Sequence, residues 1–221
     1  MVAGTVLKRG TRKLGRATVG VGFDMSGALR VQRELGLLAD RLPWLQERAI
    51  RTLYRRLPVE ARRDIQRQYN IIGSRIREHM AVRYIDSGPR LGGIRLYGQW
   101  ARGIGMANFR GTRQVRAGVS YSVYHGIRKV DKGSFLARLL QGRGRLGNLH
   151  AVERYGPKVT MQAGSYKGQK RQRLAVHYRS TVAQMLAEGR RPERLADYSR
   201  RILQQEVERQ LASYMRRPSA P

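Results

Sequence analysis

The chain has 221 residues and a formal net charge of +30, from 45 lysines and arginines against 15 acids. Its hydrophobic content of 41% supports a folded core and argues against wholesale disorder. The lack of cysteine excludes disulfides and thiolate metal sites, and no run approaches the roughly 20 apolar residues of a membrane-spanning helix.

The positive charge is concentrated in the middle of the sequence. Residues 87–187 hold 19 lysines and arginines but only two acids, Asp131 and Glu153, a net charge of +17. Charge of this density favours a partner that carries phosphate or an acidic protein surface. The basic amino terminus lacks the continuous apolar run of a signal peptide, so we expect synthesis in the cytoplasm.

Residues 1–25 are predicted to form a flexible basic arm, because glycines alternate with cations and apolar residues are few. A solvated tail without function is the alternative. As an assembly arm, the segment would contact a neighbouring subunit through its cations, which include Lys8, Arg9, Arg12 and Lys13.

Helices are predicted over residues 26–85. Ser26 is a suitable N-cap for a first helix that ends near residue 41. Pro43 suits the first turn of a second helix, and Pro58 is expected to kink or restart it. A short helix over residues 74–84 would follow. The second helix has an apolar face at helical spacing that includes Leu45, Ala49, Leu53 and Ile65.

A small antiparallel sheet with loops is predicted over residues 90–180, because the apolar period changes from 3.6 to 2 after several glycines. The clearest alternation spans residues 115–123, and we expect this strand to cover the apolar face of the second helix. Residues 135–140 are predicted as a helical turn. Shorter strands are expected near residues 127–130, 150–155 and 174–178, with a turn at Gly156–Pro157.

A long final helix is predicted over residues 192–215, with Pro192 in its first turn and a frayed tail at 217–221. Its apolar face packs on the protein's own core or docks on an adjacent subunit. That face includes Leu195, Tyr198, Ile202, Val207 and Leu211. The order of elements predicts an α+β fold in a single domain over residues 26–216.

Two glycine-bearing loops, residues 141–148 and 164–173, are the leading candidates for contact with phosphate or with an acidic partner. Flexible, solvated connectors are the alternative. Their cations are Arg143, Arg145, Lys167, Lys170 and Arg171.

Motifs of catalysis are lacking in the sequence. The four histidines are widely spaced without HExxH or HxH, and His150 and Glu153 would point to opposite faces of a strand. Gly103 and Gly105 suggest a dinucleotide loop, but the third glycine is missing. Ser134 lacks the GxSxG frame of a nucleophile elbow. We therefore predict no enzymatic activity, no cofactor and no metal.

The order of several short segments resembles the minor tail protein Z family of lambda-like tailed bacteriophages, also called tail completion proteins. The resemblance spans about residues 28–215, although Pro58 and the two glycine-bearing loops depart from the pattern. The matching segments are Arg48–Ile71, Ile94-Arg95-Leu96, Phe109-Arg110-Gly111, Gly118-Val119-Ser120, Lys132–Ala137 and Glu153–Gly156.

The resemblance implies a non-enzymatic virion protein at the head-proximal end of a long tail, assembled in the host cytoplasm. Its partners would be the tail terminator and the head-tail connector, and it would form a homo-oligomeric ring, expected to be a hexamer. The basic surface would then face DNA, without sequence preference, or acidic neighbouring rings, and no membrane is involved. Two alternatives stay open: a non-virion, sequence-independent nucleic-acid-binding protein, and a module for an acidic protein partner without DNA.

Overall fold

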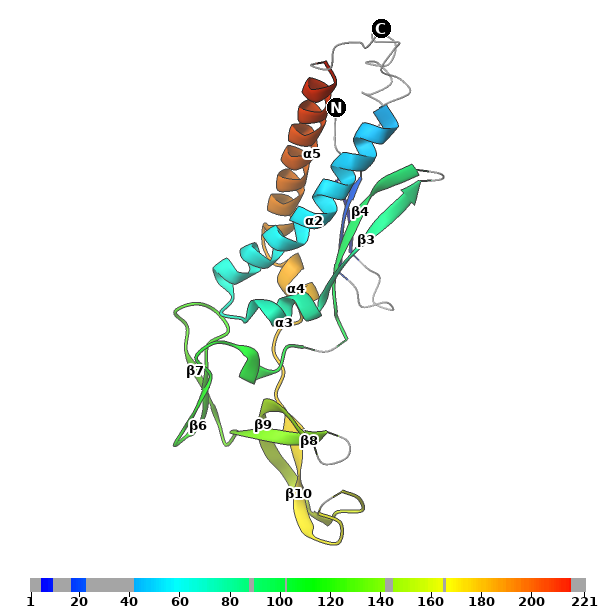
Figure 1. The fold of residues 1–221 in the computed structure, drawn as a ribbon. Helices are drawn as coiled ribbons and strands as arrows, with labels where there is room; N and C mark the ends of the chain where they lie inside the picture. Colours follow the sequence, from blue (N-terminus) through cyan, green and yellow to red (C-terminus); the bar gives the residue numbers. More distant parts are fainter. Residues whose placement is uncertain are drawn as a thin grey trace. The chain divides into compact units, whose positions relative to one another are not determined.

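The computed structural model describes residues 5–9, 17–22, 42–87, 90–101, 103–141, 145–164 and 166–215. These residues form an α+β protein (Figure 1), which confirms the predicted fold class. No helix in this part of the chain is long and apolar enough to cross a membrane. The chain divides into two compact units, where the sequence predicted one domain. Unit 1 comprises residues 1–65, 77–101 and 182–221, and unit 2 comprises residues 66–76 and 102–181.

Unit 1 contains an antiparallel sheet with the strand order β1-β2-β4-β3. Its strands are β1 (Thr5–Arg9), β2 (Ala17–Gly22), β3 (Met80–Ser87) and β4 (Arg90–Gly98). β4 lies between β2 and β3, with Leu96 opposite both Val19 and Val82. This central position explains why Ile94 and Leu96 are fully buried.

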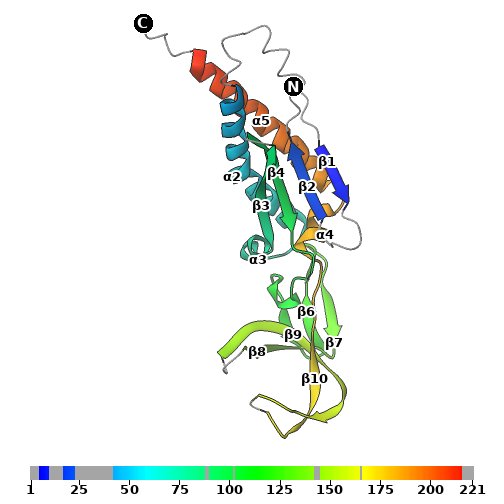
Figure 2. The same cartoon turned by 90° about the vertical axis from the view of Figure 1, so that its right-hand side faces the viewer.

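Three helices, α2 (Leu42–Gln68), α4 (Val182–Ala187) and α5 (Arg191–Met215), cover one face of this sheet (Figures 1 and 2). Tyr54 of α2 stacks on Tyr84 of β3 with 4.4 Å between ring centroids. Gly98 allows α4 to approach β4, since a Cβ there would lie 2.3 Å from the backbone nitrogen of Ala183. The predicted apolar face of the second helix is buried, including Leu45, Ala49, Leu53 and Ile65.

The final helix is confirmed as α5, and its apolar face belongs to the core of unit 1. Leu195, Ile202 and Val207 are buried, and Tyr198 and Leu211 are half-buried. A neighbouring subunit is therefore not needed to cover this face. The predicted tail at 217–221 lies outside the described residues.

The amino-terminal segment differs from the predicted flexible arm. Residues 5–9 and 17–22 are strands β1 and β2, because alternating valines in β2 can pair with the buried strand β4. Lys8 and Arg9 therefore lie in β1. Arg12, Lys13 and the predicted helix over residues 27–41 lie outside the described residues.

Two elements of the helical region differ from the prediction. Pro58 was predicted to kink or restart the second helix; α2 is one helix through Pro58, which rules out the restart, and the kink stays a prediction. The loss of one backbone hydrogen bond at Pro58 is offset by burial of Leu53, Leu57 and Ala61 around it. The predicted helix over residues 74–84 ends early as α3 (Gly73–Glu78), and β3 begins at Met80. Pairing of residues 80–87 with β4 overrides their helical spacing.

Unit 2 contains two three-stranded antiparallel sheets and the short 3-10 helix η1 (Met106–Asn108). One sheet has the order β5-β6-β7 and the other β10-β9-β8. A small core of Met106, Val119, Tyr121 and Ala151 lies within the unit. The strands are β5 (Arg113–Val115), β6 (Gly118–Tyr121), β7 (Lys129–Lys132), β8 (Phe135–Gln141), β9 (Arg145–Thr160) and β10 (Lys170–Val176).

The predicted strand over residues 115–123 is instead a hairpin, because a turn at residues 116–117 separates β5 from β6. Gly118 has φ +147°, and a Cβ there would lie 2.0 Å from the carbonyl oxygen of Asp131. This close approach joins β6 to β7. Within unit 2, Val119 and Tyr121 of β6 pack with Met106 and Ala151, whereas Leu53 is buried in unit 1, so the strand and this helix face belong to different units.

The predicted helical turn at residues 135–140 was also wrong, because these residues form strand β8. Phe135 and Leu136 pair across the sheet with Val152 and Ala151 of β9. Ala151 and Val152 are buried, and their packing stabilises the extended conformation of residues 135–140.

Candidate functional site

β9 and β10 form an antiparallel pair (Figure 2). Their residues carry a dense positive charge. We call residues 153–174 of these strands and their connecting tip the basic ribbon. Most of its residues are exposed, so its side chains are available to a partner. Its six cations are all exposed: Arg154, Lys158, Lys167, Lys170, Arg171 and Arg173.

The ribbon has a defined backbone. At its tip, Met161 N–H donates to the carbonyl of Gln169 (3.0 Å) and Gly168 N–H donates to the carbonyl of Met161 (2.9 Å). A bulge interrupts the register between residues 171 and 173, where the Gln172 amide donates to the carbonyl of Gly156 (3.0 Å). Gly156 has φ +68°, so the predicted turn at Gly156–Pro157 is a bulge inside β9. Five of the six cations are thus held on strands β9 and β10, and Lys167 lies in the turn at the tip.

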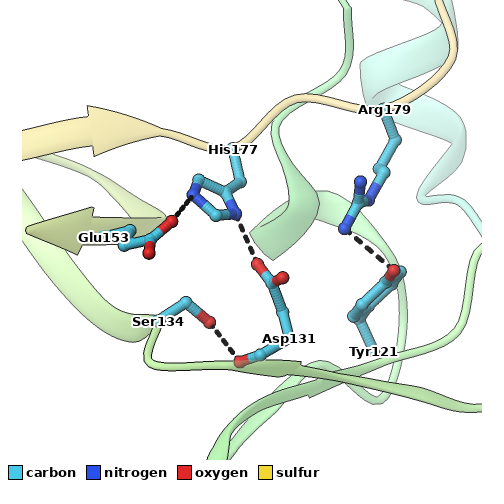
Figure 3. A network of polar contacts seen from close by, with 6 residues as sticks. All are labelled: Tyr121, Asp131, Ser134, Glu153, His177 and Arg179. Atoms are coloured by element: carbon cyan, nitrogen blue, oxygen red, sulfur yellow. Dashed lines mark hydrogen bonds and ion pairs between the residues drawn. The ribbon is translucent and has the colours of Figure 1, made fainter. Parts of the chain in front are cut away.

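No acid neutralises this surface within the described residues. None of the six ribbon cations forms an ion pair there. The only two acids of residues 87–187 both face His177 instead (Figure 3). Asp131 contacts its Nδ1, and Glu153 Oε2 lies 3.3 Å from its Nε2. Most of the ribbon's charge is therefore uncompensated.

We call Asp131, His177 and Glu153 the His177 clamp. It joins β7, which carries Asp131, to β9 and to the segment that follows β10. Both ring nitrogens face a carboxylate, Nδ1 that of Asp131 and Nε2 that of Glu153. The clamp therefore links the sheet of β7 to the base of the ribbon.

The clamp is not arranged for nucleophilic catalysis. Ser134 Oγ donates to the backbone carbonyl of Asp131 (2.7 Å) rather than to the imidazole (Figure 3). The serine therefore lacks the hydrogen bond to a base that activates a nucleophile. Within the described part of the chain, no three side chains are arranged to hold a metal ion.

A short backbone ladder fixes His177 and Arg179. Met106 N–H donates to the carbonyl of His177 (3.0 Å), and Arg179 N–H donates to that of Ile104 (2.8 Å). A Cβ at Gly103 would lie 2.1 Å from the carbonyl oxygen of Arg179. Close backbone packing therefore requires glycine at position 103. This requirement explains Gly103 without a dinucleotide-binding loop.

The structure brings together only part of the predicted contact set. Lys167, Lys170 and Arg171 lie together at the ribbon tip. Arg145 is the first residue of β9, at the opposite end of that strand, and Arg143 lies outside the described residues. The two predicted loops therefore do not form one site.

Sequence reasoning missed three ribbon cations, Arg154, Lys158 and Arg173. A turn was predicted at Gly156–Pro157, so β9 was expected to end there. Its pairing with β10 beyond that dipeptide was therefore not expected. The available signal was the recurrence of cations on both sides of that dipeptide.

Comparison of the chain with protein-family models, with curated proteins and with solved structures finds no match.

A pH dependence is expected from His150 in β9. Burial lowers its pKa, and the positive charge of Arg75 lowers it further. Since the folded state favours the neutral ring, this contribution to stability is complete above the unfolded pKa of about 6.5 and is lost as the pH falls through the lower folded pKa. We expect the melting temperature, followed by circular dichroism, to fall less between pH 7 and pH 5 in His150→Gln than in the unmodified chain. Parallel curves for the two proteins would contradict this assignment.

Proposed function

We propose that this protein is a non-enzymatic structural protein of the virion neck in a long-tailed bacteriophage, where it completes the tail for joining to the head. The observation that carries the proposal is the basic ribbon, with six exposed cations and no ion pair within the described residues. The resemblance to the minor tail protein Z family supplies the place of assembly. The neck combines DNA and protein rings, so a surface of this charge has partners of both kinds there.

The ribbon suits contact with phosphate without sequence preference. Duplex DNA carries about one negative charge per 1.7 Å of axis, and strand residues rise by about 3.3 Å each. Cations along a paired ribbon can therefore follow several consecutive phosphates. Such contacts position a protein on DNA but carry no sequence information. An acidic face of a neighbouring ring would be attracted by the same charges.

The proposed assembly is a homo-oligomeric ring, a hexamer in this proposal, at the head-proximal end of the tail. A closed ring uses heterologous contacts, in which two different surfaces of the subunit meet. The tail terminator and the head-tail connector are its proposed neighbours, and assembly takes place in the host cytoplasm. The non-virion nucleic-acid-binding protein is the alternative that the following experiment separates from this one.

Deletion of the gene should leave filled heads and full-length tails that fail to join, as seen by electron microscopy of lysates. Complementation with the unmodified chain should restore joined particles. Normal infectious particles from the deletion would exclude the neck role and favour the nucleic-acid-binding alternative. Tails of abnormal length would indicate a terminator or length-control function instead.

A further inference from the structure

A small cavity beside Arg179 in unit 2 has features that the basic ribbon lacks. Its volume is about 210 Å³. Unlike the open ribbon, it is concave, and most of its walls are aromatic or aliphatic. The residues that matter here are Tyr121, Val123, Tyr124, Ile127, Lys129 and Arg179.

Arg179 lines this cavity and brings a positive charge to it. Its Nη2 donates to the Tyr121 hydroxyl (2.8 Å), and its guanidinium lies 4.6 Å from the centre of the Tyr121 ring (Figure 3). Its Nε is buried without a hydrogen-bond partner among the described residues. No acid in this part of the chain pairs with Arg179 or Lys129. An arginine stays charged at all physiological pH values, so the lining of the cavity keeps a positive charge.

The size of the cavity limits what can enter. Small-molecule sites commonly measure about 300–1,000 Å³, so this cavity is better matched to one amino-acid side chain than to a nucleotide. Tyrosine and arginine are also the residues that dominate binding energy at protein interfaces. Ile127 at its edge is 53% exposed, which leaves apolar surface for the flanks of a partner segment.

Arg179 is also held in place before any partner arrives. Its backbone N–H donates to the carbonyl of Ile104, and Gly103 packs against its carbonyl oxygen. The guanidinium is further oriented by Tyr121. A pre-positioned arginine loses less conformational entropy on binding than a free surface arginine.

We propose that this cavity binds the carboxylate of a glutamate or aspartate from a segment of a different protein that is acidic and flanked by apolar residues. The carboxylate would accept hydrogen bonds from Arg179, and the apolar flanks would contact Val123 and Ile127. A different protein is the favoured occupant, because this chain has only 15 acids against 45 lysines and arginines, whereas an acidic segment complements the cations of the cavity. The inference rests on the proposed function only in requiring a protein neighbour.

The test uses two small probes of similar shape, 3-phenylpropionate and its neutral amide, titrated into the isotopically labelled full chain by NMR. The carboxylate should shift resonances of Tyr121, Ile127 and Arg179, and the amide should bind at least about tenfold more weakly. Arg179→Gln should lose the preference for the carboxylate. Arg128→Gln is the control, since Arg128 is exposed and does not line the cavity.

Three outcomes would overturn the proposal. Equal binding of the acid and the amide would mean that the cavity binds apolar groups and does not recognise a carboxylate. Inorganic phosphate binding as tightly as the carboxylate would make it a phosphate site. Self-association in analytical ultracentrifugation that Arg179→Gln abolishes would assign the cavity to a second copy. Arg179→Lys keeps the charge and serves as a second variant if Arg179→Gln fails to fold. Neither probe depends on DNA or on the neck, so failure here leaves the proposed function standing.

Discussion

Replacing Asp64 with alanine is expected to lower the free energy of unfolding of unit 1 by about 3–5 kcal/mol. The Asp64 side chain is 5% exposed and lies 3.3 Å from Nε of Arg191, whose side chain is fully buried. Arg194 donates to both Asp64 oxygens at 3.0 and 2.9 Å. Without the carboxylate, Arg191 would remain buried and charged, because an arginine cannot escape the cost by losing its proton.

The measurement is urea unfolding followed by tryptophan fluorescence. Both tryptophans, Trp44 and Trp100, belong to unit 1, so the signal reports on this unit. Asp197→Ala is the matched control, because Asp197 pairs with Arg200 on the same helix but the two side chains are 69% and 45% exposed. That change should alter stability by less than about 1 kcal/mol.

A second variant separates the charge effect from lost packing. Asp64→Ala combined with Arg191→Met removes both charges, and it should recover much of the lost stability because no buried charge remains. If Asp64→Ala alone unfolds at the same urea concentration as the unmodified chain, the buried pair does not stabilise unit 1.

The periodic helices were predictable, but their buried ion pair was not. Apolar spacing identifies the buried faces of α2 and α5, because the apolar residues along one side of each helix must be buried against the rest of the protein. Asp64 falls between Ala61 and Ile65 on that face, and an acid there was a signal of a buried partner. The identity of that partner, Arg191, depends on how α5 returns to α2. Asp64 and Arg191 are far apart in the sequence, so their contact produces no pattern in the residues next to either of them.

The candidate site was predictable in charge but not in geometry. The scarcity of acids in residues 87–187 is visible in the sequence and predicts an anionic partner. That both acids contact His177 depends on the meeting of β7, β9 and the segment after β10. Glycine content likewise suggested a flexible amino terminus, whereas pairing with β4 makes residues 17–22 a strand.

Removing four ribbon charges should weaken DNA binding on the order of 10³-fold at about 0.1 M salt. The variant changes Lys158, Lys167, Lys170 and Arg173 to glutamine, which removes the charge but keeps a polar side chain, and it leaves the Arg171–Tyr166 and Arg154–Phe135 contacts intact. Each lost phosphate contact should reduce the slope of log affinity against log salt by about 0.9, so the slope should fall by about 3 to 4. Fluorescence anisotropy with labelled duplexes of two unrelated sequences measures both quantities.

The control changes Arg55, Arg56, Arg63 and Arg77 to glutamine, which removes the same charge from exposed helical positions. If the affinity depends on the ribbon, this control should keep most of the affinity and most of the salt slope, because only the long-range field is reduced. Equal losses in both variants would mean that net charge alone drives binding. Unchanged affinity and slope in the ribbon variant would show that the ribbon does not contact DNA, and its cations would then serve an acidic protein neighbour.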